Sequence, residues 1–182
     1  MAASAGLERS GLGKGNGGRS IAALHRPLYT PSERARRDAS RWTLVQGILA
    51  PVQFLVFAVS LVLVIRYLAT GQGIAMANAS VVLKTFALYA IMITGALWEK
   101  DVFGQYLFAP AFFWEDVVSM AVIALHTAYL AALVLDMGTP AQRFLVALAA
   151  YFTYAINATQ FVLKLRAARK QHAATLSASA SA

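Results

Sequence analysis

Four long apolar stretches constrain the fold of this chain more than any other feature of its sequence. They cover about residues 43–69, 78–98, 110–135 and 141–165, and Asn78 is the expected N-cap of the second. At about 1.5 Å per residue, each can cross a hydrocarbon core of about 30 Å as a helix. Hydrophobic residues make up 59% of the 182 residues and charged residues only 13%, which is too apolar for a soluble domain. The sequence therefore predicts an all-α integral membrane protein with four transmembrane helices.

The net charge of +8 is concentrated at the two ends of the chain. The connections over 70–80 and 136–142 contain no Lys or Arg, although Arg66, Lys84 and Arg143 lie just inside the neighbouring spans. An even number of spans places both termini on one side, and the positive-inside rule makes that side cytoplasmic. Basic ends beside apolar runs predict contact with the lipid bilayer and its anionic headgroups. They argue against a nucleic-acid partner, because interleaved aromatic residues and a soluble body are missing.

The segments outside the spans divide the chain into three parts. Residues 1–27 are predicted to form a disordered basic tail rich in Gly and Ser, and residues 170–182 a second disordered tail. The motif "TPSE" matches a capping box, in which the side chains of Thr30 and Glu33 each accept a hydrogen bond from the other's backbone. A short basic helix is therefore expected on the cytoplasmic surface, leading into the membrane domain over 28–169.

Ionisable residues gather near one end of the second and third spans. Such residues cost on the order of 2.5–3.5 kcal/mol each at the centre of a membrane, and they are functional candidates by default. The alternative is that the outermost of them are headgroup-level residues in contact with water. The predicted topology brings four carboxylates and two glutamines to similar depth on the cytoplasmic side: Glu99, Asp101, Glu115, Asp116, Gln46 and Gln160.

A single histidine is expected deeper in the third span. His126 follows Glu115 by eleven residues, about 16 Å on nearly the same helix face. Glu115, Ser119, Val122 and His126 are therefore predicted to form one stripe along the helix. As the only ionisable group expected near mid-depth of any span, His126 is a candidate metal ligand, and a hydrogen bond between helices is the other interpretation. The lack of cysteine in the chain excludes disulfides, Fe–S clusters and Cys-ligated zinc.

Aromatic residues crowd the connection between the second and third spans. An interfacial belt is one interpretation, and a surface for a large flat ligand is the other. The set comprises Trp98, Phe103, Tyr106, Phe108, Phe112, Phe113 and Trp114.

Three segments carry a resemblance to a known family: "LYTPSERARRDASRWTLVQGILAPVQFLVF", "ITGALWEKDVFGQYLFAPAFFWEDVVSMAVIALHTAYL" and "YAINATQFVLKLRAAR". Over residues 28–169 the chain resembles the 3-vinyl bacteriochlorophyllide hydratase family of phototrophic bacteria. The resemblance implies addition of water to the C3 vinyl group of chlorophyllide a, or of its bacteriochlorin counterpart, to give a 1-hydroxyethyl group in bacteriochlorophyll a synthesis. It also implies a multi-pass protein of the inner or intracytoplasmic photosynthetic membrane, with other enzymes of that synthesis as potential partners.

The implied reaction begins with a proton delivered to the terminal CH₂ of the vinyl group. The resulting cation is delocalised into the tetrapyrrole, so no cofactor of the enzyme's own is expected, and Mg²⁺ belongs to the substrate. A carboxylic acid that is still protonated must lie in a dry pocket beside a group that activates water. Glu115 is the predicted general acid, Asp116 or Glu99 the predicted water activator, and Asp101 completes the cluster.

Substrate binding is predicted for His126, as axial ligand of the substrate's Mg²⁺, and for Trp98, Tyr106, Phe113, Trp114, Gln46 and Gln160. A non-catalytic tetrapyrrole carrier or assembly factor is the alternative, since it needs the same pocket without a proton donor. A proton-coupled transporter fits less well, because its ionisable residues would follow the full depth of several spans.

Overall fold

The computed structural model describes residues 28–180, so the predicted N-terminal tail over 1–27 lies outside the described residues. Every regular element in the described range is an α-helix, in agreement with the predicted fold class. The elements are α2 (Pro31–Ala39), α3 (Arg41–Thr70), α4 (Ile74–Phe103), α5 (Phe113–Val134) and α6 (Pro140–Ala180).

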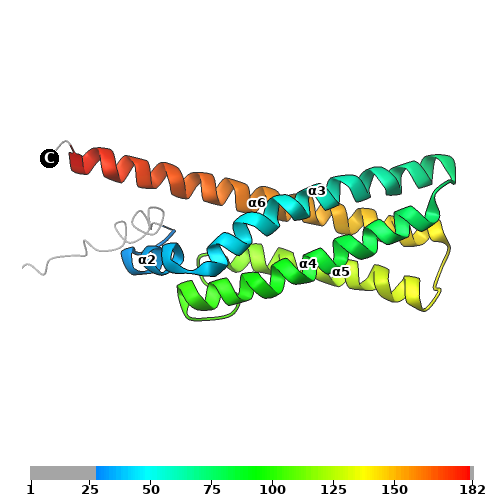
Figure 1. Cartoon of the computed structure of the whole chain (residues 1–182), viewed down its shortest axis with the longest axis horizontal. Helices are drawn as coiled ribbons and strands as arrows, with labels where there is room; N and C mark the ends of the chain where they lie inside the picture. Colours follow the sequence, from blue (N-terminus) through cyan, green and yellow to red (C-terminus); the bar gives the residue numbers. More distant parts are fainter. Residues whose placement is uncertain (1–27, 181–182) are drawn as a thin grey trace, which may run out of the picture.

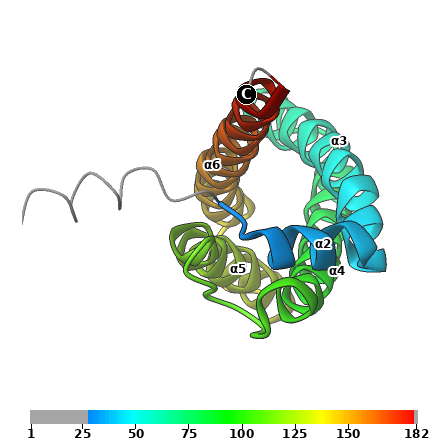
Figure 2. The ribbon, with the colours of Figure 1, turned by 90° about the vertical axis from the view of Figure 1, so that its left-hand side faces the viewer.

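Four of these helices are long and apolar enough to cross a membrane, which confirms the predicted number of spans. They form two antiparallel hairpins: α3 packs mainly on α4, and α5 mainly on α6 (Figure 1). Seen along the long axis, the four helices surround a common axis, and α2 crosses one end of the bundle (Figure 2).

Two helix boundaries differ from those expected. Gly71 and Gly73 both have positive φ, and α4 begins directly after them at Ile74. Asn78 is therefore not the N-cap, because it lies in the second turn of the helix. Its side chain instead accepts a hydrogen bond of 2.8 Å from the hydroxyl of Tyr129 on α5. At the other end of the chain, α6 continues to Ala180 through the residues assigned to the C-terminal tail.

The predicted capping box starts α2. The backbone amide of Glu33 donates to Thr30 Oγ1 at 3.3 Å, and the amide of Thr30 donates to Glu33 Oε2 at 2.7 Å. Because both reciprocal bonds are present, the helix begins where the sequence motif places it.

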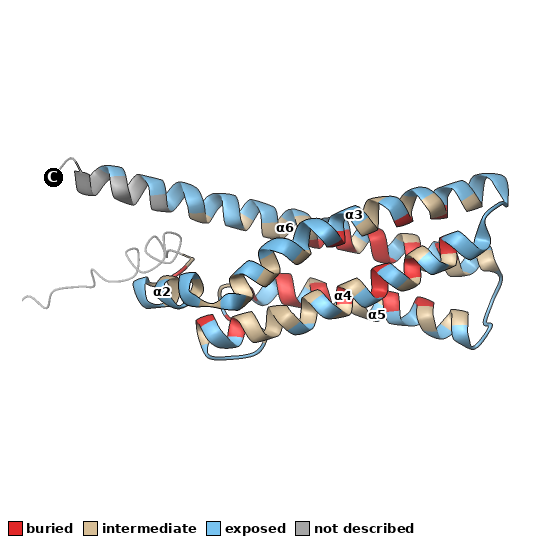
Figure 3. Ribbon diagram, in the orientation of Figure 1, coloured by how far each residue is buried: buried red, intermediate tan, exposed pale blue. Residues whose placement is uncertain are grey.

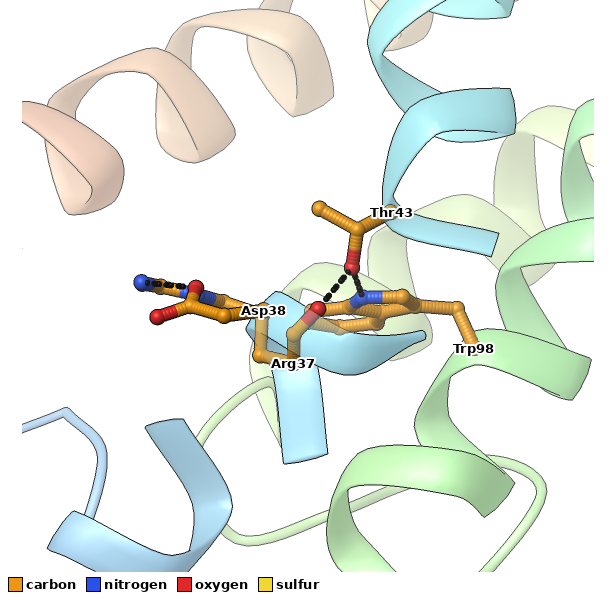
Figure 4. Close-up of polar contacts among 4 residues, drawn as sticks. All are labelled: Arg37, Asp38, Thr43 and Trp98. Carbon is orange, nitrogen blue, oxygen red and sulfur yellow. Dashed lines mark hydrogen bonds and ion pairs between the residues drawn. The ribbon is translucent and has the colours of Figure 1, made fainter. Parts of the chain in front are cut away.

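Side-chain hydrogen bonds hold α2 against the bundle. The guanidinium Nε of Arg36 donates to the carbonyl of Val102 in α4 at 2.7 Å. Figure 4 shows Thr43 between two partners: its hydroxyl donates to the carbonyl of Arg37 at 2.6 Å and accepts from the indole N–H of Trp98 at 2.9 Å. These bonds join α2, α3 and α4 at one end of the bundle.

Burial follows the pattern of a bundle surrounded by lipid. Large apolar residues such as Leu55 and Phe152 are exposed. The buried residues, red in Figure 3, lie mainly where the helices face one another. Several of the inward residues are polar or ionisable, in two zones that are described next.

Candidate active site

The connection between α4 and α5 directs two consecutive amides at two carboxyl groups. Gly104 ends α4 with a φ of 84°, and Phe108 has a φ of 59°. After this turn the amide of Phe108 donates to Asp116 Oδ2 at 2.7 Å, and the amide of Ala109 donates to Glu99 Oε2 at 3.2 Å. The connection thus fixes the last turn of α4 against the first turn of α5 through these two acids.

The carboxyl groups of Glu99 and Asp116 are also close enough to interact with each other. Both side chains are buried, at 5% and 3% exposure. Two buried carboxylates beside each other repel, and a proton on one of them relieves that repulsion. This geometry places two acids where they can hold one proton between them.

Glu115 has a different partner. Its Oε2 accepts a hydrogen bond of 2.5 Å from the ammonium of Lys164 on α6. The same ammonium donates to the carbonyl of Ala111 and lies 5.0 Å from the ring centroid of Phe112. Glu115 is therefore held as the anion of an ion pair. In the sequence Lys164 is one of the basic residues near the C-terminal end, and it stands between Leu163 and Leu165 at the end of an apolar span. We call Glu99, Glu115, Asp116 and Lys164 the acid zone.

The other predicted polar residues at this end lie outside the acid zone. Asp101 is exposed and accepts a hydrogen bond of 2.8 Å from the hydroxyl of Ser40. The amide of Gln46 donates to Thr94 Oγ1 at 2.7 Å, between α3 and α4. Gln160 lines an open groove along α6, and its Oε1 has no hydrogen-bond partner among the described residues.

The predicted aromatic set divides into an inner and an outer group. The ring of Trp98 packs edge-on against Phe103 and Phe112, with centroids 5.8 and 5.5 Å apart, and this group closes the end of the bundle. The outer group points away from the interior. It comprises Tyr106, Phe108, Phe113 and Trp114, with 57%, 39%, 44% and 68% of their surface exposed.

Lys84 is the main site residue that sequence analysis missed. It is fully buried, and its Nζ lies 3.7 Å from the ring centroid of Tyr154 with no hydrogen-bond partner in the described part of the chain. The expectation that His126 is the only ionisable group near mid-depth is therefore wrong. Because α4 begins at Ile74 rather than Asn78, Lys84 lies ten residues, about 15 Å, into the span instead of near its rim.

His126 is likewise fully buried, with its Nδ1 2.8 Å from the carbonyl oxygen of Val122. A carbonyl oxygen only accepts, so Nδ1 carries the hydrogen. In the neutral ring this leaves the lone pair on Nε2, which has no partner among residues 28–180. That form of histidine is the one that binds metal ions.

Two buried amides complete this second region. Both side-chain polar atoms of Gln53 lack partners among the described residues, and so does Oδ1 of Asn157. The amide nitrogen of Asn157 donates to Ser119 Oγ at 2.7 Å. We call Gln53, Lys84, His126 and Asn157 the deep zone.

One face of α5 joins the acid zone to the deep zone. The four residues of the stripe expected there, Glu115, Ser119, Val122 and His126, are all buried, so the stripe faces inward. Partners on the antiparallel α6 follow in order: Lys164 for Glu115, Asn157 for Ser119, and the ring of Tyr151 at 5.8 Å from that of His126. No cluster of three or more His, Asp or Glu residues able to hold a metal ion occurs in the described part of the chain.

Comparison with known proteins assigns the family. The model of the 2-vinyl bacteriochlorophyllide hydratase family matches residues 29–167, which include both zones. This chain belongs to the 2-vinyl bacteriochlorophyllide hydratase family. A relative of that name from Cereibacter sphaeroides is 70% identical over 150 residues, 82% of this chain and 93% of the relative. Another from Rhodobacter capsulatus is 66% identical over 146 residues, 80% and 85% of the two chains. No solved structure matches significantly.

Members of this hydratase family carry a "2-vinyl" in their names, where the resemblance above reads "3-vinyl". The two numbers denote the same ring position in the older and newer numbering of the macrocycle. The family assignment from the three quoted segments is therefore confirmed.

Proposed function

We propose that this chain is a hydratase that adds water to the vinyl group of chlorophyllide a or 3-vinyl bacteriochlorophyllide, giving the 1-hydroxyethyl product in bacteriochlorophyll synthesis. The observation that carries the proposal is the 70% identity to a relative named for this reaction, over 93% of that relative. The acid zone supports it independently, because vinyl hydration needs a buried proton donor and a proton acceptor together.

The proton donor in this proposal is the Glu99–Asp116 pair. The pair gives its shared proton to the terminal CH₂, and the vinyl π bond supplies the electrons of the new C–H bond. The positive charge then rests on the inner carbon and the macrocycle. Water attacks that carbon and returns a proton to the pair, so the net change is the addition of one H₂O.

Glu115 is proposed to stabilise positive charge in the reaction without donating the proton. Its carboxyl group is engaged by the ammonium of Lys164, so the proposed donor is the neighbouring pair rather than Glu115 itself. Both Glu115 and Lys164 interact electrostatically with Asp116, and an anion close to the reacting carbon stabilises the developing cation. Asp101 receives no proton-transfer role, because it faces Ser40 on the surface.

His126 is proposed as the axial ligand of the substrate's Mg²⁺, through the free lone pair of Nε2. Glu115 and His126 are about 16 Å apart along α5, so one macrocycle serves both only when it stands along the bundle axis. The ring of Trp98 would pack against its edge at the acid end. The metal arrives with the substrate, and the proposed chemistry uses no cofactor of the enzyme.

The proposed topology has both termini and α2 on the cytoplasmic side of the inner or intracytoplasmic membrane. It is supported by the basic residues of α2 and the end of α6, and by their absence from the two opposite connections. In this orientation the acid zone lies near the cytoplasmic headgroups, where water and an amphiphilic pigment are both available. The outer aromatic residues then lie at the headgroup level.

An isotope experiment tests the function directly. Membranes that contain the protein are incubated with chlorophyllide a in ¹⁸O-water, and the pigment is analysed by mass spectrometry. The expected product is heavier by one H₂¹⁸O and is absent with Asp116→Asn. Pigment that is bound tightly but recovered unchanged from the wild-type protein contradicts a hydratase and supports the carrier alternative.

A further inference from the structure

Lys84 carries a buried ammonium group to which no described residue gives an anion. It is fully buried, and among residues 28–180 its ammonium has only the face of the Tyr154 ring at 3.7 Å. A cation over an aromatic ring gains part of its lost hydration energy. An unpaired charge inside a membrane span is nevertheless costly, and such residues mark binding sites or ion paths.

Other buried residues with unpartnered atoms point to a ligand rather than to a structural partner. Gln53, His126 and Asn157 each have at least one unpartnered polar atom among the described residues. They come from the three other spans, and His126 is close enough to Lys84 for an electrostatic interaction. Buried polar groups are normally paired, and several unpaired ones together indicate a bound polar group.

We infer that Lys84 binds the free carboxylate of the tetrapyrrole substrate and so selects the unesterified acid over its esters. This inference rests on the proposed function for the identity of the pigment. A chlorophyllide differs from a chlorophyll in that its propionate side chain is a free acid. That carboxylate is the one permanent anion of the molecule, and Lys84 is the one fully buried cation among the described residues.

A propionate bound at Lys84 is compatible with a vinyl group placed at the acid zone. The propionate and the vinyl group are carried by different pyrrole rings, so one macrocycle can present them to two separate sites. Lys84 is close enough to His126 for an electrostatic interaction between them. With the carboxylate at Lys84 and the metal at His126, the vinyl-bearing ring is not needed for either contact and is free to point toward the acid zone.

The test compares chlorophyllide a with its propionate methyl ester. Pigment fluorescence reports the affinity of each for the purified protein in detergent. The wild-type protein is expected to bind the acid at least tenfold more tightly than the ester. Lys84→Met should lose that preference, mainly by weaker binding of the acid, and Lys84→Arg should keep part of it. Lys170→Met removes an exposed cation and is the control, with unchanged preference.

Two further measurements keep the inference separate from folding and from the reaction. Without pigment, Lys84→Met should melt at a higher temperature than the wild-type protein, because it removes an unpaired buried charge. Water addition to chlorophyllide a is followed in parallel by mass. If the acid preference is real but no protein hydrates the pigment, the proposed function fails and the carboxylate site stands.

Three results overturn the carboxylate site. The first is a wild-type protein that binds acid and ester equally. The second is a Lys84→Met variant that keeps the preference for the acid. The third is a variant that keeps the preference but loses turnover, which assigns Lys84 to proton transfer instead of substrate selection.

Discussion

The acid zone and the deep zone are both buried and polar, but they differ in how their polar atoms are partnered. In the acid zone every carboxyl group has a donor from this chain: Phe108, Ala109 or Lys164. In the deep zone Gln53, Lys84, His126 and Asn157 all retain unpartnered atoms within the described residues. The first zone is preorganised by the fold itself. The second is arranged so that a ligand completes it.

The largest effect on activity should come from a variant in which the Glu99–Asp116 pair can no longer pass on its proton. Asp116→Asn replaces a carboxyl that can pass a proton by an amide that cannot, so turnover should fall about 10³-fold. Turnover is measured by the mass gain of chlorophyllide a. Asp38→Asn alters an exposed acid on α2 that pairs with Arg37 and is the control. Activity of Asp116→Asn within tenfold of wild type would remove the pair from the mechanism.

The next effect concerns the stability of the same zone. Lys164→Met leaves the buried Glu115 without its cation, and the free energy of unfolding should fall by about 3 kcal/mol. Denaturation in detergent micelles measures this loss. The double variant Glu115→Gln with Lys164→Met should recover most of the stability, because neither charge remains. If the stability losses of the two single variants simply add in the double variant, the two side chains are not coupled.

A smaller effect is expected for a single ligand of the deep zone. His126→Leu should weaken binding of the Mg²⁺ pigment about tenfold, or about 1.4 kcal/mol, and shift its absorption. Thr127→Ala changes the next residue of α5, which is exposed, and serves as the control. Unchanged affinity together with an unchanged spectrum would exclude His126 as the axial ligand.

The smallest effect compares two glutamines on α3. Gln46 donates to Thr94, so Gln46→Leu should lower the stability of the pigment-free protein by about 1 kcal/mol. Gln53 is buried without partners, so Gln53→Leu should raise it by a similar amount, since no hydrogen bond is lost. Thermal unfolding measures both variants. A loss of stability in both would mean that Gln53 is satisfied in the protein after all.

One error of sequence analysis lies in a helix boundary. Hydropathy located the four spans and the motif TPSE located the capping box of α2, because both depend on residues close together in the chain. It placed the start of the second span at Asn78, and that shift of four residues moved Lys84 from mid-depth to the rim. Gly73, which adopts a positive φ, marks the true start, but two glycines close together leave the boundary open within a few residues.

The sequence also could not predict which of these side chains pair with each other. From the sequence, the four acids could be grouped only by their depth, and Glu115 was the predicted general acid. The four are Glu99, Asp101, Glu115 and Asp116. The structure separates them, because the rotation of each helix decides which side chain faces inward. Lys164 on α6 then pairs with Glu115, and Asp101 turns to Ser40.

The sequence by itself determined the class of the protein, the number of spans, the family and the end of the bundle where the acids gather. These depend on apolar length, local motifs and identity along the chain. Only the tertiary structure decided that Glu99 lies beside Asp116 and that Lys84 has no counter-ion among the described residues. The physical reason is that pairing depends on helix rotation and register between segments far apart in sequence, which hydrophobic patterning leaves undetermined.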